Sequence, residues 1–176
     1  MKKVAIIIAS KDFRDEEYFI PKQILEDNKI TVKTVSDKPK ALGRFGGEAE
    51  ADILIDNLDI DSFDAIIFVG GQGAVELLDN QTSYDLIKGA VESDKIIGAI
   101  CIAPTILANA GTLKGKKATV WSSGMDKSAI DIIRLNGGSY EKKAVVIDGN
   151  IVTGENAESA EEFGNAIVQM LTKDSI

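Results

Sequence analysis

The stretch Lys95-Ile96-Ile97-Gly98-Ala99-Ile100-Cys101-Ile102-Ala103-Pro104 decides the fold of this chain. Its apolar first half predicts a buried strand that ends at a sharp turn into a helix. Ala99 and Ala103 stand two positions before and after Cys101, as a nucleophile elbow requires, because bulky side chains there would collide in the turn. Pro104 suits the first turn of the following helix, where a missing N–H costs little. The stretch therefore predicts a strand–turn–helix unit with Cys101 at its tip.

Outward from this unit, apolar strands alternate with amphipathic helices. Strands are predicted at 4–8, 31–35, 64–69, 95–100 and 118–121, with a hairpin at 144–153 and a hairpin or short β-excursion within 43–59. Helices are predicted at 15–28, 83–93, 102–110, 127–135 and 158–172. Such alternation favours a mostly parallel sheet in three layers. In these sheets, sites lie beyond the carboxyl ends of the strands, where the predicted loops 10–17, 70–74 and 101–104 meet.

The composition limits the class of protein. A length of 176 residues fits one domain, 1–176, and a lone cysteine forms no internal disulfide. The start Met1-Lys2-Lys3 resembles a signal peptide, but the apolar run after it is too short, which favours a first strand. The net charge of −8 argues against a nucleic-acid partner, and no run approaches the ~18 apolar residues of a membrane helix. We expect a cytoplasmic, soluble protein without a membrane partner.

Cys101 is the candidate nucleophile. At a helix N-terminus, the helix dipole and free N–H groups lower the pKa of a thiol, so we expect an activated cysteine. The alternative is an inert, buried cysteine that serves as a small core residue. The chain contains no histidine, so the usual base beside such a cysteine is missing.

Glycines in the predicted loop 70–74 offer backbone N–H donors. Within Gly70-Gly71-Gln72-Gly73, the N–H of Gly71 and that of Ile102 are placed to form an oxyanion hole; the alternative is a plain strand-to-helix turn. A dinucleotide fingerprint fails because Glu76 stands where the third glycine belongs, so we predict no cofactor. No cluster has metal-ligand spacing, and we predict no metal.

Glu17 is the candidate partner of the thiol. Asp15 and Glu16 are explained as carboxylates at a helix start, whereas Glu17 precedes the apolar Tyr18. If this turn faces the elbow, Glu17 is buried against Cys101, and desolvation and like charge raise its pKa. It would then be protonated and donate a hydrogen bond to sulfur. Tyr18 and Trp121, with Phe45, are candidates for lining a small pocket, and each is equally a candidate for the core.

These motifs together resemble the ThiJ/PfpI superfamily, which contains intracellular-protease-like and parkinsonism-associated deglycase-like proteins. The resemblance rests on the elbow with its following helix and loop, and it covers nearly the whole chain. Segments that agree with the family in order are 99–108, 110–119, 13–17 with Pro21, 63–65 leading into Gly70-Gly71, 148–153 and the last helix with Phe163.

The resemblance implies a flavodoxin-like α/β/α sandwich, related to class I glutamine amidotransferase domains, that forms a homodimer or a larger homo-oligomer. It implies that Cys101 is the nucleophile and Glu17 its protonated acid partner. Gly71 and Ile102 match the oxyanion-hole positions, and Gly70 is grouped with them as a substrate-binding residue.

Three departures from the family change the expected chemistry. Protease-like members carry histidine where this chain has Ile102, and the deglycase-like branch has a histidine near the position of Trp121. Many members have Ser-Arg where this chain has Gly154-Glu155. A Cys-His-Glu triad is therefore impossible, and peptidase or amidase activity is the least favoured expectation.

The resemblance and the residues together predict a cysteine-dependent enzyme that uses a Cys101–Glu17 pair. Its expected substrates are small reactive carbonyls such as methylglyoxal, in a glutathione-independent glyoxalase or a deglycase reaction. The alternative is a non-enzymatic stress protein, redox-sensing or chaperone-like, in which Cys101 oxidises to the sulfinate. A third hypothesis is a scaffold that binds small ligands and has lost its chemistry.

Overall fold

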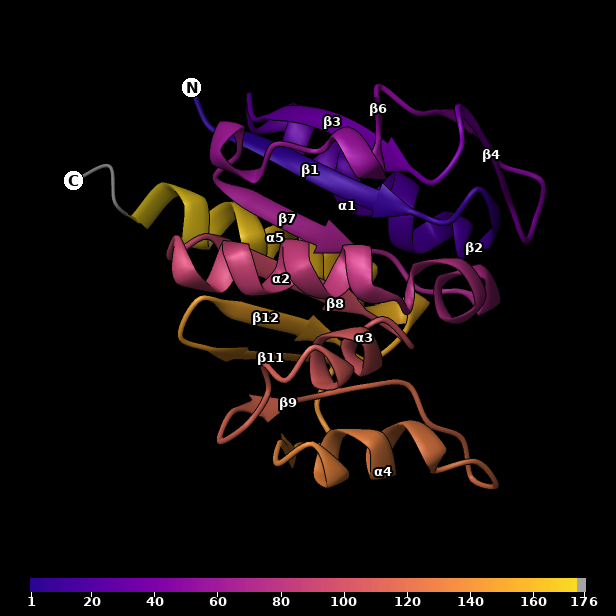
Figure 1. Cartoon of the computed structure of the whole chain (residues 1–176), viewed down its shortest axis with the longest axis vertical. Helices are drawn as coiled ribbons and strands as arrows, with labels where there is room; N and C mark the ends of the chain where they lie inside the picture. The colour runs from indigo at the N-terminus through magenta and orange to yellow at the C-terminus, as the bar shows by residue number, and fades with distance from the viewer. Residues whose placement is uncertain (174–176) are drawn as a thin grey trace.

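A computed structural model describes residues 1–173 and contains a central seven-stranded sheet (Figure 1). The strand order is β11-β12-β8-β7-β1-β3-β6, and neighbouring strands are parallel except β11 and β12. The strands are β1 (Lys3–Ile8), β3 (Thr31–Ser36), β6 (Ile53–Leu54), β7 (Ala65–Phe68), β8 (Ile96–Ile100), β11 (Val145–Asp148) and β12 (Ile151–Gly154).

Helices cover both faces of this sheet, which makes the predicted three-layer sandwich. Figure 1 shows α2 in front of the sheet and α5 behind it. The helices are α1 (Asp15–Asp27), α2 (Gln81–Glu92), α3 (Pro104–Asn109), α4 (Ser128–Leu135) and α5 (Ala160–Thr172). Within residues 1–173, no helix is long and apolar enough to span a bilayer.

The continuous apolar run of β1 follows from its two covered faces. Alternate side chains of a strand point to opposite faces. Val4, Ile6 and Ile8 therefore pack with Leu25 of α1 and Phe163 of α5 on one side. The residues between them, Ala5 and Ile7, belong to a second core on the other side, with Ile87 of α2 and Ile106 of α3.

The region around the sheet departs from the sequence prediction in its short elements. The predicted excursion becomes β4 (Lys40–Gly43) paired antiparallel with β5 (Glu48–Glu50). A third strand, β2 (Lys11–Phe13), joins them, although residues 10–17 were predicted as a loop. The segment Lys11–Phe13 is too short and too charged to show the alternating pattern of a strand. Only its pairing with β4 in the structure identifies β2 as a strand.

Other short elements complete the chain. The helix predicted at 102–110 begins only at Pro104, because residues 101–103 form the turn itself. Of the strand predicted at 118–121, only Ala118 lies in a strand, the two-residue Lys117–Ala118, which pairs with Ser139–Tyr140. The remaining elements are β9 (Lys117–Ala118), β10 (Ser139–Tyr140), three 3₁₀ turns η1 (Ile55–Asn57), η2 (Ile60–Ser62) and η4 (Ala157–Ser159), and the π-helical turn η3 (Ala74–Leu78).

Candidate active site

Cys101 lies directly after β8, at the carboxyl edge of the sheet, with a backbone φ of +63°. A left-handed conformation at a non-glycine residue costs about 1–3 kcal/mol and needs support from the surroundings. Two hydrogen bonds supply it: Cys101 N–H donates to Gly154 O (2.9 Å), and Trp121 N–H donates to Cys101 O (2.8 Å). The tight turn predicted from the flanking alanines is therefore present, and it projects the thiol out of the sheet.

Glu17 lies in the first turn of α1 and is 1% exposed. Its Oε2 accepts a hydrogen bond from the N–H of Gly70 at 3.0 Å. Burial raises the pKa of Glu17 to about 7, although hydrogen bonds with the Cys101 thiol and Gly70 and the charge of Arg14 lower it. Oε1 is buried and has no hydrogen-bond partner of its own among residues 1–173. The carboxyl therefore gains and loses a proton near neutral pH.

The thiol of Cys101 differs from the expectation of a lowered pKa. Burial raises the pKa of Cys101, and the negative charge of Glu17 and its hydrogen bond to the thiol raise it further. The N–H groups of Ile102 and Gly71 act in the opposite direction but do not prevail. The helix dipole was expected to dominate, but α3 has only six residues, and burial together with the charge of Glu17 outweighs it.

The three backbone donors predicted around the thiol divide into two roles. The N–H groups of Gly71 and Ile102 act on the Cys101 thiol and lower its pKa. Gly71 has a φ of +102°, and a Cβ there would lie 2.5 Å from Asp12 O, so only glycine fits. The N–H of Gly70 is occupied by Glu17. The assignment of Gly70 to an oxyanion or substrate-binding role is therefore wrong for its N–H, which positions the carboxyl.

Two hollows open beside Cys101. One, of about 300 Å³, is lined by Arg14, Arg44, Gly71, Gln72, Cys101, Ile102 and Trp121. The other, of about 250 Å³, is lined by Arg14, Glu17, Cys101, Trp121, Asn156, Ala157 and Glu158. Trp121 is a wall of both, as predicted. The sequence did not predict Arg14, Arg44 and Gln72 as lining residues. Arg44 reaches the site through the pairing of Phe13 with Gly43, and these segments are about thirty positions apart in the chain.

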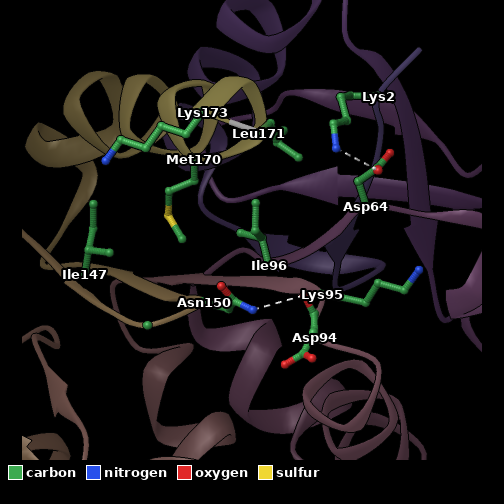
Figure 2. Close-up of a pocket in the computed structure, with 11 residues that line it drawn as sticks. Lys2, Asp64, Asp94, Lys95, Ile96, Ile147, Asn150, Met170, Leu171 and Lys173 are labelled. Atoms are coloured by element: carbon green, nitrogen blue, oxygen red, sulfur yellow. Dashed lines mark hydrogen bonds and ion pairs between the residues drawn. The ribbon is translucent and has the colours of Figure 1, made fainter. Parts of the chain in front are cut away.

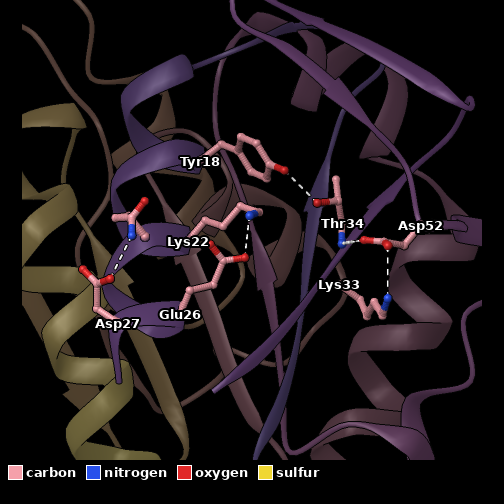
Figure 3. A network of polar contacts seen from close by, with 8 residues as sticks. Tyr18, Lys22, Glu26, Asp27, Lys33, Thr34 and Asp52 are labelled. Carbon is pink, nitrogen blue, oxygen red and sulfur yellow. Dashed lines mark hydrogen bonds and ion pairs between the residues drawn. The ribbon is translucent and has the colours of Figure 1, made fainter. Parts of the chain in front are cut away.

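Tyr18 does not line either hollow, and its assignment as a pocket residue is wrong. Its side chain is 3% exposed and packs edge-on against Phe13, with ring centroids 5.5 Å apart. Its hydroxyl shares a 2.7 Å hydrogen bond with Thr34 Oγ1 of β3, as Figure 3 shows. Although Tyr18 directly follows Glu17, the helix turns its side chain into the core.

A larger hollow, of about 490 Å³, lies at the opposite edge of the sheet, where β7 and β8 begin (Figure 2). Its polar contacts are an ion pair between Lys2 and Asp64 (3.3 Å) and a hydrogen bond from Asn150 to Asp94 O (3.0 Å). Cys101 and Glu17 are not among its lining residues. In residues 1–173, no group of three or more His, Cys, Asp or Glu side chains is placed to hold a metal ion.

Comparison with known proteins gives consistent matches along the chain. The family model described as the DJ-1/PfpI family matches residues 2–170. A protein of Methanocaldococcus jannaschii, named uncharacterized protein MJ0967, is 38% identical over 98% of this chain and 84% of its own length. A protein of Thermococcus kodakarensis named deglycase TK1284 is 27% identical over 94% of this chain and 98% of its own.

The fold agrees with a solved structure over nearly its whole length. The crystal structure of a ThiJ/PfpI domain protein from Brachyspira murdochii superposes with a TM-score of 0.91, at 31% identity, over 99% of this chain and 97% of that one. Three findings agree: the α/β/α sandwich, the strained cysteine after β8, and the family match over residues 2–170. This chain belongs to the DJ-1/PfpI family.

Proposed function

We propose that this protein is a cysteine-dependent enzyme that acts on small reactive carbonyls, with Cys101 as nucleophile and Glu17 as its acid–base partner. The observation that carries the proposal is the buried Glu17 carboxyl in contact with the Cys101 thiol, with a pKa of about 7. A group with a pKa near the working pH is the most effective general acid or base. Relatives named deglycase support an enzyme that acts on carbonyl compounds or their adducts.

In the first step, the thiol adds to an aldehyde. The Glu17 carboxylate takes the thiol proton while Sγ of Cys101 bonds to the carbonyl carbon. The negative charge that forms on the carbonyl oxygen lies near the N–H groups of Gly71 and Ile102, which stabilise it. Protonation of this oxygen by Glu17 gives a hemithioacetal and restores the carboxylate.

With an oxoaldehyde such as methylglyoxal, the second step moves a proton between neighbouring carbons. The Glu17 carboxylate removes the proton from the carbon bonded to sulfur and returns it to the adjacent carbonyl carbon, by way of an enediol. The product is a thioester of a hydroxy acid on Cys101. Water then breaks the carbon–sulfur bond, releasing lactate and regenerating the thiol, so the net reaction is methylglyoxal plus water to lactate.

Lactate formation from methylglyoxal tests this proposal. Wild type is expected to convert methylglyoxal to lactate, and Cys101→Ser is expected to lose this activity. Glu17→Gln is expected to form the adduct on Cys101, detected by intact mass, without producing lactate. Loss of a proton-transfer group typically costs ~100 to 10,000-fold in rate. If Glu17→Gln produces lactate as fast as wild type, the pair mechanism is wrong. If wild type forms no hydroxy acid from methylglyoxal or other oxoaldehydes, the proposed activity is wrong.

Peptidase chemistry has less support. Amide hydrolysis requires a base that then protonates a leaving amine, a role usually held by histidine, and this chain has none. We expect no release from fluorogenic peptides. Release that survives purification but disappears in Cys101→Ala would contradict this expectation.

The second candidate function is redox sensing. The donors that would stabilise a carbonyl oxyanion are equally able to bind the oxygens of a cysteine sulfinate. These donors are Gly71 N–H, Ile102 N–H and a protonated Glu17. Two equivalents of peroxide convert the thiol to sulfinate, with one water released by each. Intact mass after mild peroxide treatment, with Cys101→Ser as control, detects the gain of two oxygen atoms. A protein that shows this gain but makes no lactate fits the second function.

A further inference from the structure

Two of the three arginines in the chain line the same hollow beside the only cysteine. Arg14 directly precedes α1, and Arg44 follows β4. The pairing of β2 with β4 brings them together, because Phe13 lies opposite Gly43 and the N–H of Arg44 donates to Phe13 O at 2.9 Å. The proximity of the two guanidinium groups is therefore built into the small sheet.

The loop that carries Arg44 is held in place by Asp15. The two carboxylate oxygens of Asp15 accept hydrogen bonds from the N–H of Phe45 (2.9 Å) and of Gly47 (2.6 Å). A Cβ on Gly43 or on Gly47 would come within 2.6 Å of the Asp15 carboxylate, so the loop passes too close for a larger residue. Asp15, explained from sequence as a helix-start carboxylate, thus also positions Arg44.

Neither guanidinium has used all its donors. Arg14 bonds to Glu16 through Nε (2.9 Å) and Nη2 (3.4 Å), and its Cζ lies 4.7 Å from the ring centre of Phe45, which leaves Nη1 without a partner among residues 1–173. Arg44 has only a loose ion pair, Nη1 to Asp12 Oδ2 at 3.7 Å. Within the described chain its side chain makes no hydrogen bond.

The two hollows beside Cys101 differ in their charged side chains. Among the described residues, no acidic side chain lines the hollow that holds Arg14 and Arg44, and its other walls are Gln72, Ile102 and Trp121. The second hollow shares Arg14 with the first but also contains Glu17 and Glu158. The first hollow thus presents two guanidinium groups next to Cys101, each with unused donors, and their carboxylate partners, Glu16 and Asp12, are not among its lining residues.

We propose that this hollow binds a carboxylate or phosphate group on the substrate, so that the preferred substrates are anionic carbonyl compounds rather than neutral ones. Guanidinium groups bind both kinds of anion through paired N–H donors. The anion would lie between Arg14 and Arg44 and direct the carbonyl carbon to Cys101. The substrate part of this inference rests on the proposed function, whereas the anion site itself does not.

Alkylation of Cys101 tests the anion site without any turnover. Iodoacetate and iodoacetamide react alike, with a new S–C bond, loss of iodide and release of the thiol proton to the buffer, but only iodoacetate is charged. The ratio of their rates cancels changes in thiol reactivity. Relative to 2-mercaptoethanol, we expect the ratio to favour iodoacetate by about tenfold, the order of electrostatic attraction in a charged cleft.

Variants at the arginines decide the result. Arg14→Gln and Arg44→Gln should each lower the iodoacetate preference several-fold, and Arg44→Lys should retain part of it. Arg134→Gln, on the exposed face of α4, changes the net charge equally and should leave the ratio unchanged. Equal ratios in wild type, Arg14→Gln and Arg44→Gln would overturn the proposal. Circular dichroism of each variant confirms that the comparison is made between folded proteins.

Protection and turnover then separate the two anions and the two proposals. Acetate and inorganic phosphate are compared as protectants against iodoacetamide, and the one effective at lower concentration identifies the group. For turnover, 4,5-dioxopentanoate is compared with its methyl ester, and kcat/KM should favour the acid. Turnover of both without preference would overturn the substrate class but leave the proposed function standing. An arginine-dependent alkylation ratio without any turnover would retain the anion site and reject the proposed function.

Discussion

The backbone N–H of Gly70 donates a 3.0 Å hydrogen bond to Oε2 of Glu17, although 53 positions separate the two residues. This bond joins the end of β7 to the first turn of α1 and sets the carboxyl against Cys101. A Cβ on residue 70 would lie 2.6 Å from Glu17 Oε2 and 2.7 Å from Cys101 Cβ. The glycine therefore permits the contact between the acid and the thiol, and four predictions test this arrangement.

Gly70→Ala should separate Glu17 from Cys101. The added methyl group has no space, and overpacking of this kind costs about 1–3 kcal/mol. We expect a lower free energy of unfolding, measured by urea denaturation. We also expect a changed pKa of Glu17, measured by ¹³C NMR of its carboxyl carbon. Gly124→Ala is the matched control, because a Cβ there meets nothing within 4 Å. Equal stability and an unchanged Glu17 pKa in Gly70→Ala would show that the close packing is not required.

Glu17→Gln should change how stability depends on pH. The pKa of Glu17 rises from 4.5 to about 7 on folding, so the native state binds more protons between these values. The free energy of unfolding of wild type should therefore fall as pH rises from about 4.5 to above 7. The total fall is about 3 kcal/mol, at roughly 1.4 kcal/mol for each pH unit.

Glutamine does not titrate, so this fall should be absent from Glu17→Gln. The variant should gain stability relative to wild type at pH 8 compared with pH 4, as measured by urea unfolding across the pH range. Glu162→Gln removes an exposed carboxylate from the first turn of α5 and serves as the control. Parallel pH curves for wild type and Glu17→Gln would contradict the raised pKa.

Glu17→Gln should also lower the pKa of the Cys101 thiol. Burial remains, but the negative charge and the hydrogen bond of Glu17 that raise this pKa are removed. The midpoint of the pH profile for iodoacetamide alkylation should move to lower pH. A midpoint that stays in place, or moves up, would mean that the carboxylate does not control the thiol.

Cys101→Gly should be more stable than Cys101→Ala. Both variants lose the thiol, but only glycine adopts a φ of +63° without strain. The expected difference is about 1 kcal/mol in the free energy of unfolding. Ala103→Gly, at a helical φ of −61°, should instead be destabilised relative to wild type. If Cys101→Gly is the less stable of the two cysteine variants, the turn does not store strain.

The sequence by itself determined the layers of this protein and the position of its reactive turn. The apolar run of β1 and the alternation of strands and helices predict a covered parallel sheet, since these signals depend on residues next to one another. The alanines around Cys101 and the glycines at 70 and 71 predict close backbone approach for the same reason. The absence of histidine, which limits the chemistry, is likewise a property of composition.

The tertiary structure decided what surrounds the thiol. The helix dipole predicted a lowered thiol pKa, but the burial of Glu17 against Cys101 reverses the direction. Tyr18 turns into the core, whereas Arg44 reaches the site through the pairing of β2 with β4. The pKa of a side chain and the charge of a pocket depend on contacts between residues that are far apart in the chain. Local sequence patterns do not predict those contacts.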